Sequence, residues 1–137
     1  MRAQYIRRTL GAAAIFGAGA IAGLSAQTLT DNPHRSELKR ADLSGAPGME
    51  VISSIVEVKP GESIDLHFHH GVEAYYALQG GTLEYADGRH VDMVAGTSGM
   101  NLRDVKHRGF KNVGDTSAEF FTVHVVDKGR PLYDYSK

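Results

Sequence analysis

Short runs of β-type residues, separated by turn residues, fill the chain from Glu50 onward. Apolar and β-branched side chains dominate each run, and the turn pairs include Pro60-Gly61 and Asp87-Gly88. No helical periodicity of comparable length is present in this part of the chain. The pattern predicts seven strands, over residues 51–58, 63–69, 73–78, 82–86, 90–94, 100–105 and 118–126. Seven short strands at close spacing indicate an all-β fold, either an antiparallel sandwich or a small barrel.

The first 26 residues have the layout of a signal peptide. Arg2, Arg7 and Arg8 precede an uncharged apolar run of residues 10–24, and small residues follow it. This run is shorter than the ~20 residues that a membrane-spanning helix needs, so we expect cleavage and no stable membrane insertion. The Arg7-Arg8 pair resembles a twin-arginine signal, which exports folded proteins. The sequence therefore predicts an exported protein, periplasmic or secreted.

The remaining chain divides into three segments. Residues 27–49 are polar and contain Pro33, Gly45 and Pro47, so we expect an N-terminal arm without a long regular element. Residues 50–127 form the predicted β domain, and residues 128–137 form a C-terminal tail.

Composition narrows the possible partners. The 137 residues contain no cysteine and suffice for one domain whose core needs no disulfides. Without the first 26 residues the chain has 12 basic and 16 acidic side chains, a net charge of −4. An acidic domain of this size is not expected to bind nucleic acid.

Histidine and glutamate gather in one short segment. On a strand, His67 and His69 project from the same face about 7 Å apart along the chain, so both can reach one ion. Gly71 lets the chain reverse, which returns Glu73 to the same place on the neighbouring strand. Two neutral imidazoles and a carboxylate on one face can hold iron(II) or a related divalent ion, with positions open to water or substrate.

The same segment resembles the cupin family. It fits the first cupin motif at all five fixed positions, Gly61, His67, His69, Glu73 and Gly80. The second motif is matched at Gly96 and His107, whereas Leu102 and Asp104 replace its proline and glycine and Asn112 comes one residue late. The loop before His107 is therefore expected to differ in shape from the usual cupin loop.

The resemblance implies a single cupin jelly-roll barrel with one divalent transition metal ion per subunit. It adds His107 as the fourth ligand to His67, His69 and Glu73. Nitrogen and oxygen ligands discriminate poorly among iron, manganese, nickel and zinc, so the ion's identity stays open.

Other side chains are candidates for roles beside the ion. Tyr75 shares the face of Glu73, and His124 lies on the inner face of the last strand, so both are candidate catalytic residues. Arg103 has the parity to face the cavity and is a candidate for binding a carboxylate substrate; the alternative is an exposed cation on a loop. We expect His70 and His90 to be exposed and without a role.

Three functions fit these features. The first is a dioxygenase-like enzyme acting on an oxygen-rich small molecule. The second is a non-redox lyase or isomerase, and the third is a module that binds a sugar or carboxylate without catalysis. The resemblance also implies a homodimer through the outer sheet face, which would cover outward-facing Phe68, Tyr76 and Leu78.

Overall fold

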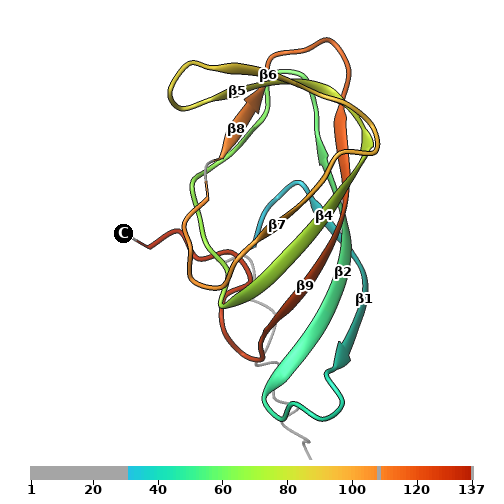
Figure 1. Ribbon diagram of the computed structural model, residues 1–137, viewed down its shortest axis with the longest axis vertical. Helices are drawn as coiled ribbons and strands as arrows, with labels where there is room; N and C mark the ends of the chain where they lie inside the picture. Colours follow the sequence, from blue (N-terminus) through green and yellow to red (C-terminus); the bar gives the residue numbers. More distant parts are fainter. Residues whose placement is uncertain (1–30, 108, 137) are drawn as a thin grey trace, which may run out of the picture.

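The computed structural model describes residues 31–107 and 109–136, and these residues form an all-β fold (Figure 1). The signal peptide predicted for residues 1–26 lies outside the described residues. In the described part of the chain, no helix is long and apolar enough to cross a membrane. The strands are β1 Arg35–Asp42, β2 Met49–Val58, β3 Ser63–Ile64, β4 Gly71–Gln79, β5 Gly81–Tyr85, β6 His90–Met93, β7 Ser98–Asn101, β8 Phe110–Asn112 and β9 Ala118–Asp127.

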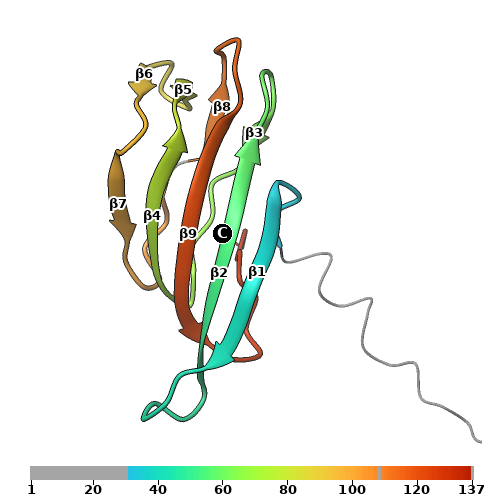
Figure 2. The same cartoon turned by 90° about the vertical axis from the view of Figure 1, so that its right-hand side faces the viewer.

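The strands form two antiparallel sheets. The larger sheet has the order β1-β2-β9-β4-β7, and the smaller has the order β3-β8-β5-β6. Figure 1 shows the smaller sheet folded over one end of the larger one, and Figure 2 shows the outer face of the larger sheet with no described element in front of it. The arrangement is the predicted jelly roll, with two separate sheets in place of a closed barrel.

Alternating burial explains why the long strands β2 and β9 sit at the centre of the larger sheet. Every second residue of each strand is buried on the inner face, and the two strands pair over their full length. The main core contains Val58, Ala77, Leu83 and Phe120 and lies between the two sheets. This core closes one end of the fold, and the predicted metal ligands lie at the other end of the same inner face.

Five predicted strands match observed ones with shifted ends, and two boundaries are wrong. Strand β3 stops at Ile64, because the segment that carries the histidines makes single bridges instead of a ladder. Strand β7 spans Ser98–Asn101 and does not run on to residue 105, because a turn begins after Asn101. The short strand β8 was not predicted, since three residues give no alternation to detect.

The expectation of an irregular arm over residues 27–49 is wrong. This segment contains β1, an eight-residue edge strand paired with β2. Its side chains form an ion-pair network in which Arg40 binds Glu50 at 2.7 Å and Glu37 at 2.8 Å. An edge strand that is stabilised by backbone pairing and charge pairs lacks the apolar alternation on which the prediction depended.

The C-terminal tail is part of the fold. Residues 128–136 return across the inner face, where Leu132 and Tyr133 are buried against Ile52 and Val126. Backbone hydrogen bonds join Asp134 to Phe68, the residue between two predicted ligands. The tail therefore covers the segment that carries the candidate site, and Phe68, expected on an open outer face, is half-buried beneath it.

Candidate metal centre

His67 and His107 face each other across an isolated antiparallel bridge. The His107 N–H donates to the His67 carbonyl at 3.0 Å, and the two backbones bring the rings to a centroid distance of 4.2 Å. The ring of His69 lies 4.9 Å from each of the other two rings. The structure therefore brings together three histidines from two segments that lie about 40 positions apart in the sequence.

Each of these rings is oriented by a backbone carbonyl that accepts its Nδ1–H. The acceptors are Asp65 for His67 at 2.7 Å, Leu132 for His69 at 2.5 Å and Val105 for His107 at 3.3 Å. A proton on Nδ1 leaves a lone pair on Nε2. Ligating histidines commonly have such a partner on the second ring nitrogen, which fixes the tautomer.

The three Nε2 atoms converge. The Nε2 atoms of His67 and His107 are 2.8 Å apart, and the buried Nε2 of His69 has no hydrogen-bond partner. The Nε2 lone pairs of His67 and His107 face each other, and that of His69 accepts no hydrogen bond. This arrangement destabilises the folded protein unless a cation or a proton lies between the nitrogens.

Glu73 approaches this cluster from β4. Its Oε2 lies 3.3 Å from Nε2 of His69 and 3.8 Å from Nε2 of His107. Cross-strand register explains its other contacts, since Glu73 is paired with Asn101 of β7 on one side and with His124 of β9 on the other. The Asn101 amide donates to Oε2 at 2.7 Å, and Nε2 of His124 lies 3.3 Å from Oε1.

Burial favours the neutral form of His67, His107 and His124. Burial is the main cause that lowers the pKa of His67 to about 4, and it also lowers the pKa of His107 and His124. Burial alone would raise the pKa of Glu73, but contacts with His124 and His69 outweigh it and hold that pKa well below its usual value. Neutral imidazoles beside an ionised carboxylate are the protonation states that a divalent cation requires.

The separations suit one ion. Ligand atoms about 2.1 Å from a metal lie roughly 3.0 Å apart at right angles and roughly 3.4 Å apart in a tetrahedron. The contacts of Glu73 with His69 and His107, and that between His67 and His107, span 2.8 to 3.8 Å around these values. Within the described residues two overlapping donor sets, His67 with His69 and His107 and His69 with Glu73 and His124, are each close enough to hold one divalent transition metal ion.

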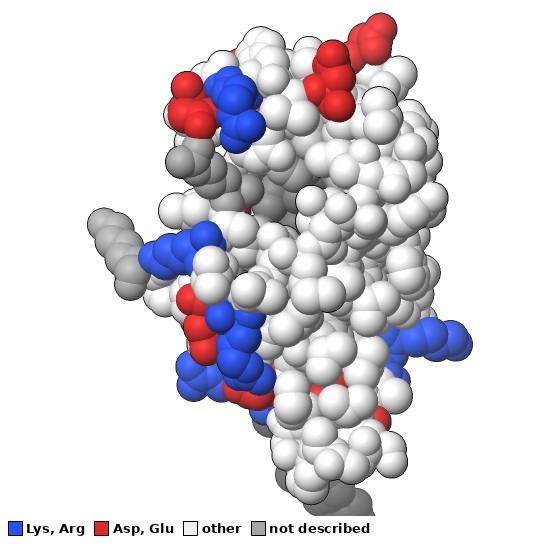
Figure 3. Space-filling model, viewed as in Figure 1, with Lys and Arg blue, Asp and Glu red and all other residues white. Residues whose placement is uncertain are grey.

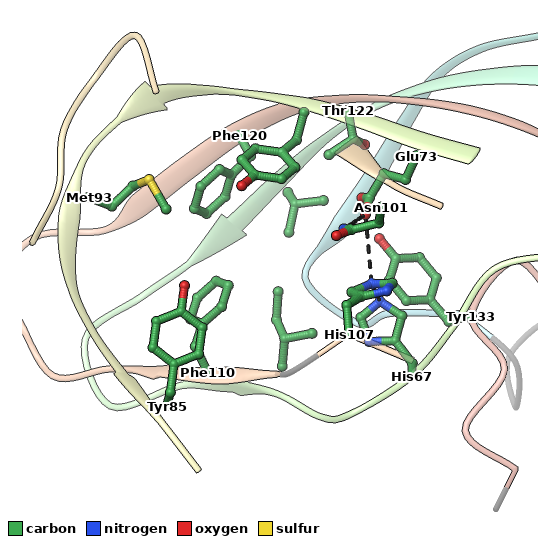
Figure 4. A pocket seen from close by; sticks show the side chains of 13 residues that line it. His67, Glu73, Tyr85, Met93, Asn101, His107, Phe110, Phe120, Thr122 and Tyr133 are labelled. Atoms are coloured by element: carbon green, nitrogen blue, oxygen red, sulfur yellow. Dashed lines mark hydrogen bonds and ion pairs between the residues drawn. The ribbon is translucent and has the colours of Figure 1, made fainter. Parts of the chain in front are cut away.

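The cluster opens on a cavity of about 220 Å³. Figure 4 shows His67, His107, Glu73, Asn101 and Tyr133 at one end of it. At the other end the wall is apolar, with Met93, Phe110 and Phe120. A bound ion at the cluster would thus be in reach of a small molecule inside the fold.

The three other candidates lie in different places. Tyr75 lines the cavity, with its hydroxyl against Gly99 and a pKa raised chiefly by burial. His124 is fully buried and lies against Glu73, but it is not among the residues that line the cavity. Arg103 does not reach the cavity, because its guanidinium forms two hydrogen bonds, of 2.8 and 2.9 Å, with the Asp127 carboxylate on the surface.

The expectation that His70 is exposed is wrong, whereas His90 is exposed as predicted. Only 9% of His70 is accessible, and its two ring nitrogens contact Asp104 at 3.2 Å and Asp134 at 3.0 Å. The turn before the site and the C-terminal tail enclose it from opposite sides. The alternation of side chains along the expected strand placed His70 on the outer face. It gave no indication that the C-terminal tail would cover that face.

Asp104, at the position of the motif glycine, has an unusual backbone conformation. It has a φ of 57°, the left-handed conformation that favours glycine and that aspartate tolerates better than most residues. Its N–H donates to the His69 carbonyl at 2.9 Å. The turn in front of His107 is therefore left-handed at the position where the motif has glycine.

Three residues of the site were missed by sequence reasoning. Asn101 orients Glu73, the Leu132 carbonyl orients His69, and the buried Tyr133 ring lies 4.7 to 4.9 Å from the rings of His67 and His69. An asparagine at the end of a short strand and a tyrosine in a tail match no motif. The only available signal was the apolar pair Leu132-Tyr133 near an otherwise polar end.

Comparison with known proteins identifies the family. Residues 54–124, more than half of the chain, match the cupin domain family. The chain belongs to the cupin family. The match includes His67, His69, Glu73 and His107, so the histidine and glutamate cluster lies within the cupin domain. No curated protein matches this cupin.

Solved structures support the same fold. An uncharacterised protein with a double-stranded β-helix domain from Klebsiella pneumoniae is 14% identical, with a TM-score of 0.56 over 86% of this cupin and 99% of the other chain. The polyketide cyclase RemF from Streptomyces resistomycificus is 21% identical, with a TM-score of 0.50 over 68% of this cupin and 75% of that chain. At these identities the likeness shows the fold alone.

Proposed function

We propose that this cupin is a metal-dependent enzyme that acts on an oxygen-bearing small molecule in a dioxygenase-like reaction. The observation that carries the proposal is the convergence of three carbonyl-oriented imidazoles and Glu73 at the end of an internal cavity. A divalent ion bound there supplies Lewis acidity and, if it is redox-active, electron transfer to dioxygen.

The residues around the ion have separate tasks. His67, His69, Glu73 and His107 hold it, and Asn101 fixes the carboxylate by its hydrogen bond to Oε2. Tyr133 covers the histidines and keeps water away, since its ring is buried and packs on two of them.

The cavity favours the redox reaction over a lyase or isomerase. Proton abstraction needs a base whose pKa lies near the working pH. Outside the ligand set, the titratable residues that line the described cavity are Tyr75, Tyr85 and Tyr133. Burial raises the pKa of Tyr75 and raises that of Tyr133 well above its usual value, so these two hydroxyls stay protonated and cannot accept a proton. The overall dioxygenase reaction removes no proton from the substrate, because both oxygen atoms enter it and it supplies the four electrons.

Metal analysis and oxygen uptake test the proposal. Protein purified without added metal should contain about one divalent ion per chain, and iron-loaded protein should consume dioxygen when a substrate is present. Product formation that continues unchanged under argon would instead establish a non-redox lyase or isomerase. Binding without any turnover would establish a binding module.

We also propose that the chain forms a homodimer through the outer face of β4 and β7. Tyr76, Leu78 and Met100 are 45 to 61% exposed there, and Figure 2 shows no described element over this face. Light scattering at micromolar concentration should give twice the chain mass, and Tyr76→Glu should give a monomer with unchanged metal content. A wild-type mass of one chain would contradict the dimer.

The N-terminal 26 residues support export to the periplasm or beyond. The basic start, the apolar run and the small residues after it are the grounds for this proposal.

A further inference from the structure

The wall of the cavity has two chemically different halves. The metal half consists of His67, Glu73, Asn101 and His107. The apolar half consists of Val56, Ile64, Met93, Phe110 and Phe120, with the rings of Tyr75 and Tyr85 beside them. Figure 4 shows Met93, Tyr85, Phe110 and Phe120 gathered at the end away from Glu73 and the two labelled histidines.

The apolar half is continuous with the protein core. Phe120 belongs to the buried core cluster, and Ile64, Tyr75, Tyr85, Met93 and Phe110 pack against it. Phe110 and Phe120 have a centroid distance of 5.9 Å, and Tyr85 lies 6.5 Å from Phe110. These aromatic rings offer a molecule in the cavity apolar faces and edges at van der Waals distance.

Charge in the cavity is confined to the metal half. No lysine or arginine lines the cavity among residues 31–107 and 109–136, and its carboxylate, Glu73, is engaged by Asn101 and the histidines. Figure 3 shows that the surface is hollowed on this face and that most of the coloured charged side chains stand away from the hollow. A carboxylate or phosphate on the body of a ligand would therefore lose its hydration without gaining a partner from these residues.

We propose that the cavity binds a small molecule with an uncharged apolar body, aromatic for preference, and a hydroxyl or carbonyl head. The head lies at the histidine cluster and the body lies between Phe110, Phe120 and Met93. This class is narrower than oxygen-rich molecules in general and excludes sugar acids. This inference rests on the proposed function only in that the head group binds the ion.

The size of the cavity sets an upper limit on the body. Pockets for drug-sized ligands are roughly 300–1,000 Å³, and this cavity has about 220 Å³. A single substituted ring with its head group is therefore the expected scale.

Three probes that share an ion-binding head test the class. They are 4-methylcatechol, 3,4-dihydroxybenzoate, which places a carboxylate at the apolar end of the same ring, and gluconate, a polyhydroxy acid. Titration calorimetry on zinc-loaded protein under argon measures binding without turnover. 4-Methylcatechol should bind at least about tenfold more tightly than either acid, because 3,4-dihydroxybenzoate brings a charge, and gluconate a row of hydroxyl groups, against the apolar half.

Two neighbouring residues provide a matched pair of variants. Met93 lines the cavity, whereas Val94 is 64% exposed and does not line it. Met93→Gln keeps the length of the side chain and adds an amide, and it should weaken 4-methylcatechol binding about tenfold. Val94→Gln should change it less than about twofold, and both variants should keep the zinc content of the wild type.

The outcomes separate this inference from the proposed function. Equal or tighter binding of either acid, no binding of 4-methylcatechol, or equal effects of the two variants would overturn the inference. Oxygen uptake with a sugar acid would overturn it too and leave the dioxygenase-like reaction standing. Selective 4-methylcatechol binding without oxygen uptake with any substrate would support the class of ligand and count against the reaction.

Discussion

Replacing His67 with alanine is expected to lower the affinity for Zn²⁺ by at least about a thousandfold. Mutation of a residue that merely orients a ligand already lowers metal affinity roughly 10–100-fold, and His67 is itself a proposed ligand. His67 contributes one of three converging Nε2 atoms, in contact with that of His107 at 2.8 Å. Its side chain lines the cavity, so truncation widens a space that already exists and opens no new void in the core. Competition with a chromophoric chelator measures the affinity.

Glu73→Gln provides an independent variant at the same centre. It keeps the shape of the side chain and removes the negative charge that faces His69, His107 and His124, so its zinc affinity should fall by a similar amount. Circular dichroism of the metal-free variants should match the wild type, because the core lies between the sheets and does not depend on the ion.

His90→Ala is the control for this prediction. His90 is exposed and pairs with Glu84 on a hairpin of the smaller sheet. Its removal should leave zinc affinity within about twofold, the range expected for a surface change. A loss of zinc as large as that in His67→Ala would show that the ligands are wrongly assigned.

The sequence predicted that His67, His69 and Glu73 lie together, because their proximity depends on short-range geometry. His67 and His69 share a face through the two-residue period of extended chain, and Gly71 allows the close pairing of β4 with β9 that brings Glu73 alongside. A side chain at Gly71 would collide with the Val125 carbonyl, so this close pairing requires glycine.

The surroundings of the cluster could not be predicted, because they depend on pairing between distant segments. The Leu132 carbonyl reaches His69 across 63 positions, and Asp134 reaches His70 across 64. Such contacts arise when the tail finds the inner face of the sheet, and no local periodicity encodes that pairing. The edge strand β1 was missed for a related reason, since its stabilisation comes from charge pairs and from pairing with β2.

Arg103 shows the limit of strand parity as an argument. The alternation of side chains allowed it to face the cavity, but the strand ends at Asn101 and the following turn carries Arg103 to Asp127 on the surface, which agrees with the alternative of an exposed loop cation. The alternation of side chains between two faces predicts orientation only for residues within the strand. His124, by contrast, lies inside a ten-residue strand, and its inward orientation was predicted correctly.

Acid should weaken the metal-free fold over a defined range of pH. The pKa of His67 is about 4 in the folded protein, against about 6.5 when unfolded. Between these values the unfolded chain holds more protons, so stability falls as pH drops from about 6.5 and the loss is complete below about 4. A shift of this size corresponds to about 3 kcal/mol, with His107 and His124 adding in the same direction. The lowered pKa of Glu73 acts at still lower pH, where its protonation removes further stability.

The same protons compete with the ion, so metal release should be steeper than a one-proton curve. Three imidazoles must be neutral to bind, and the buried positions that lower the pKa of His67 and His107 delay their protonation. We expect half-release of zinc between about pH 6 and pH 4, measured as bound zinc after dialysis across a pH series. Circular dichroism of the same samples separates release from a folded protein from release by unfolding. A slope of one proton, or full retention of zinc at pH 4, would mean that carboxylates hold the ion and that the three histidines do not.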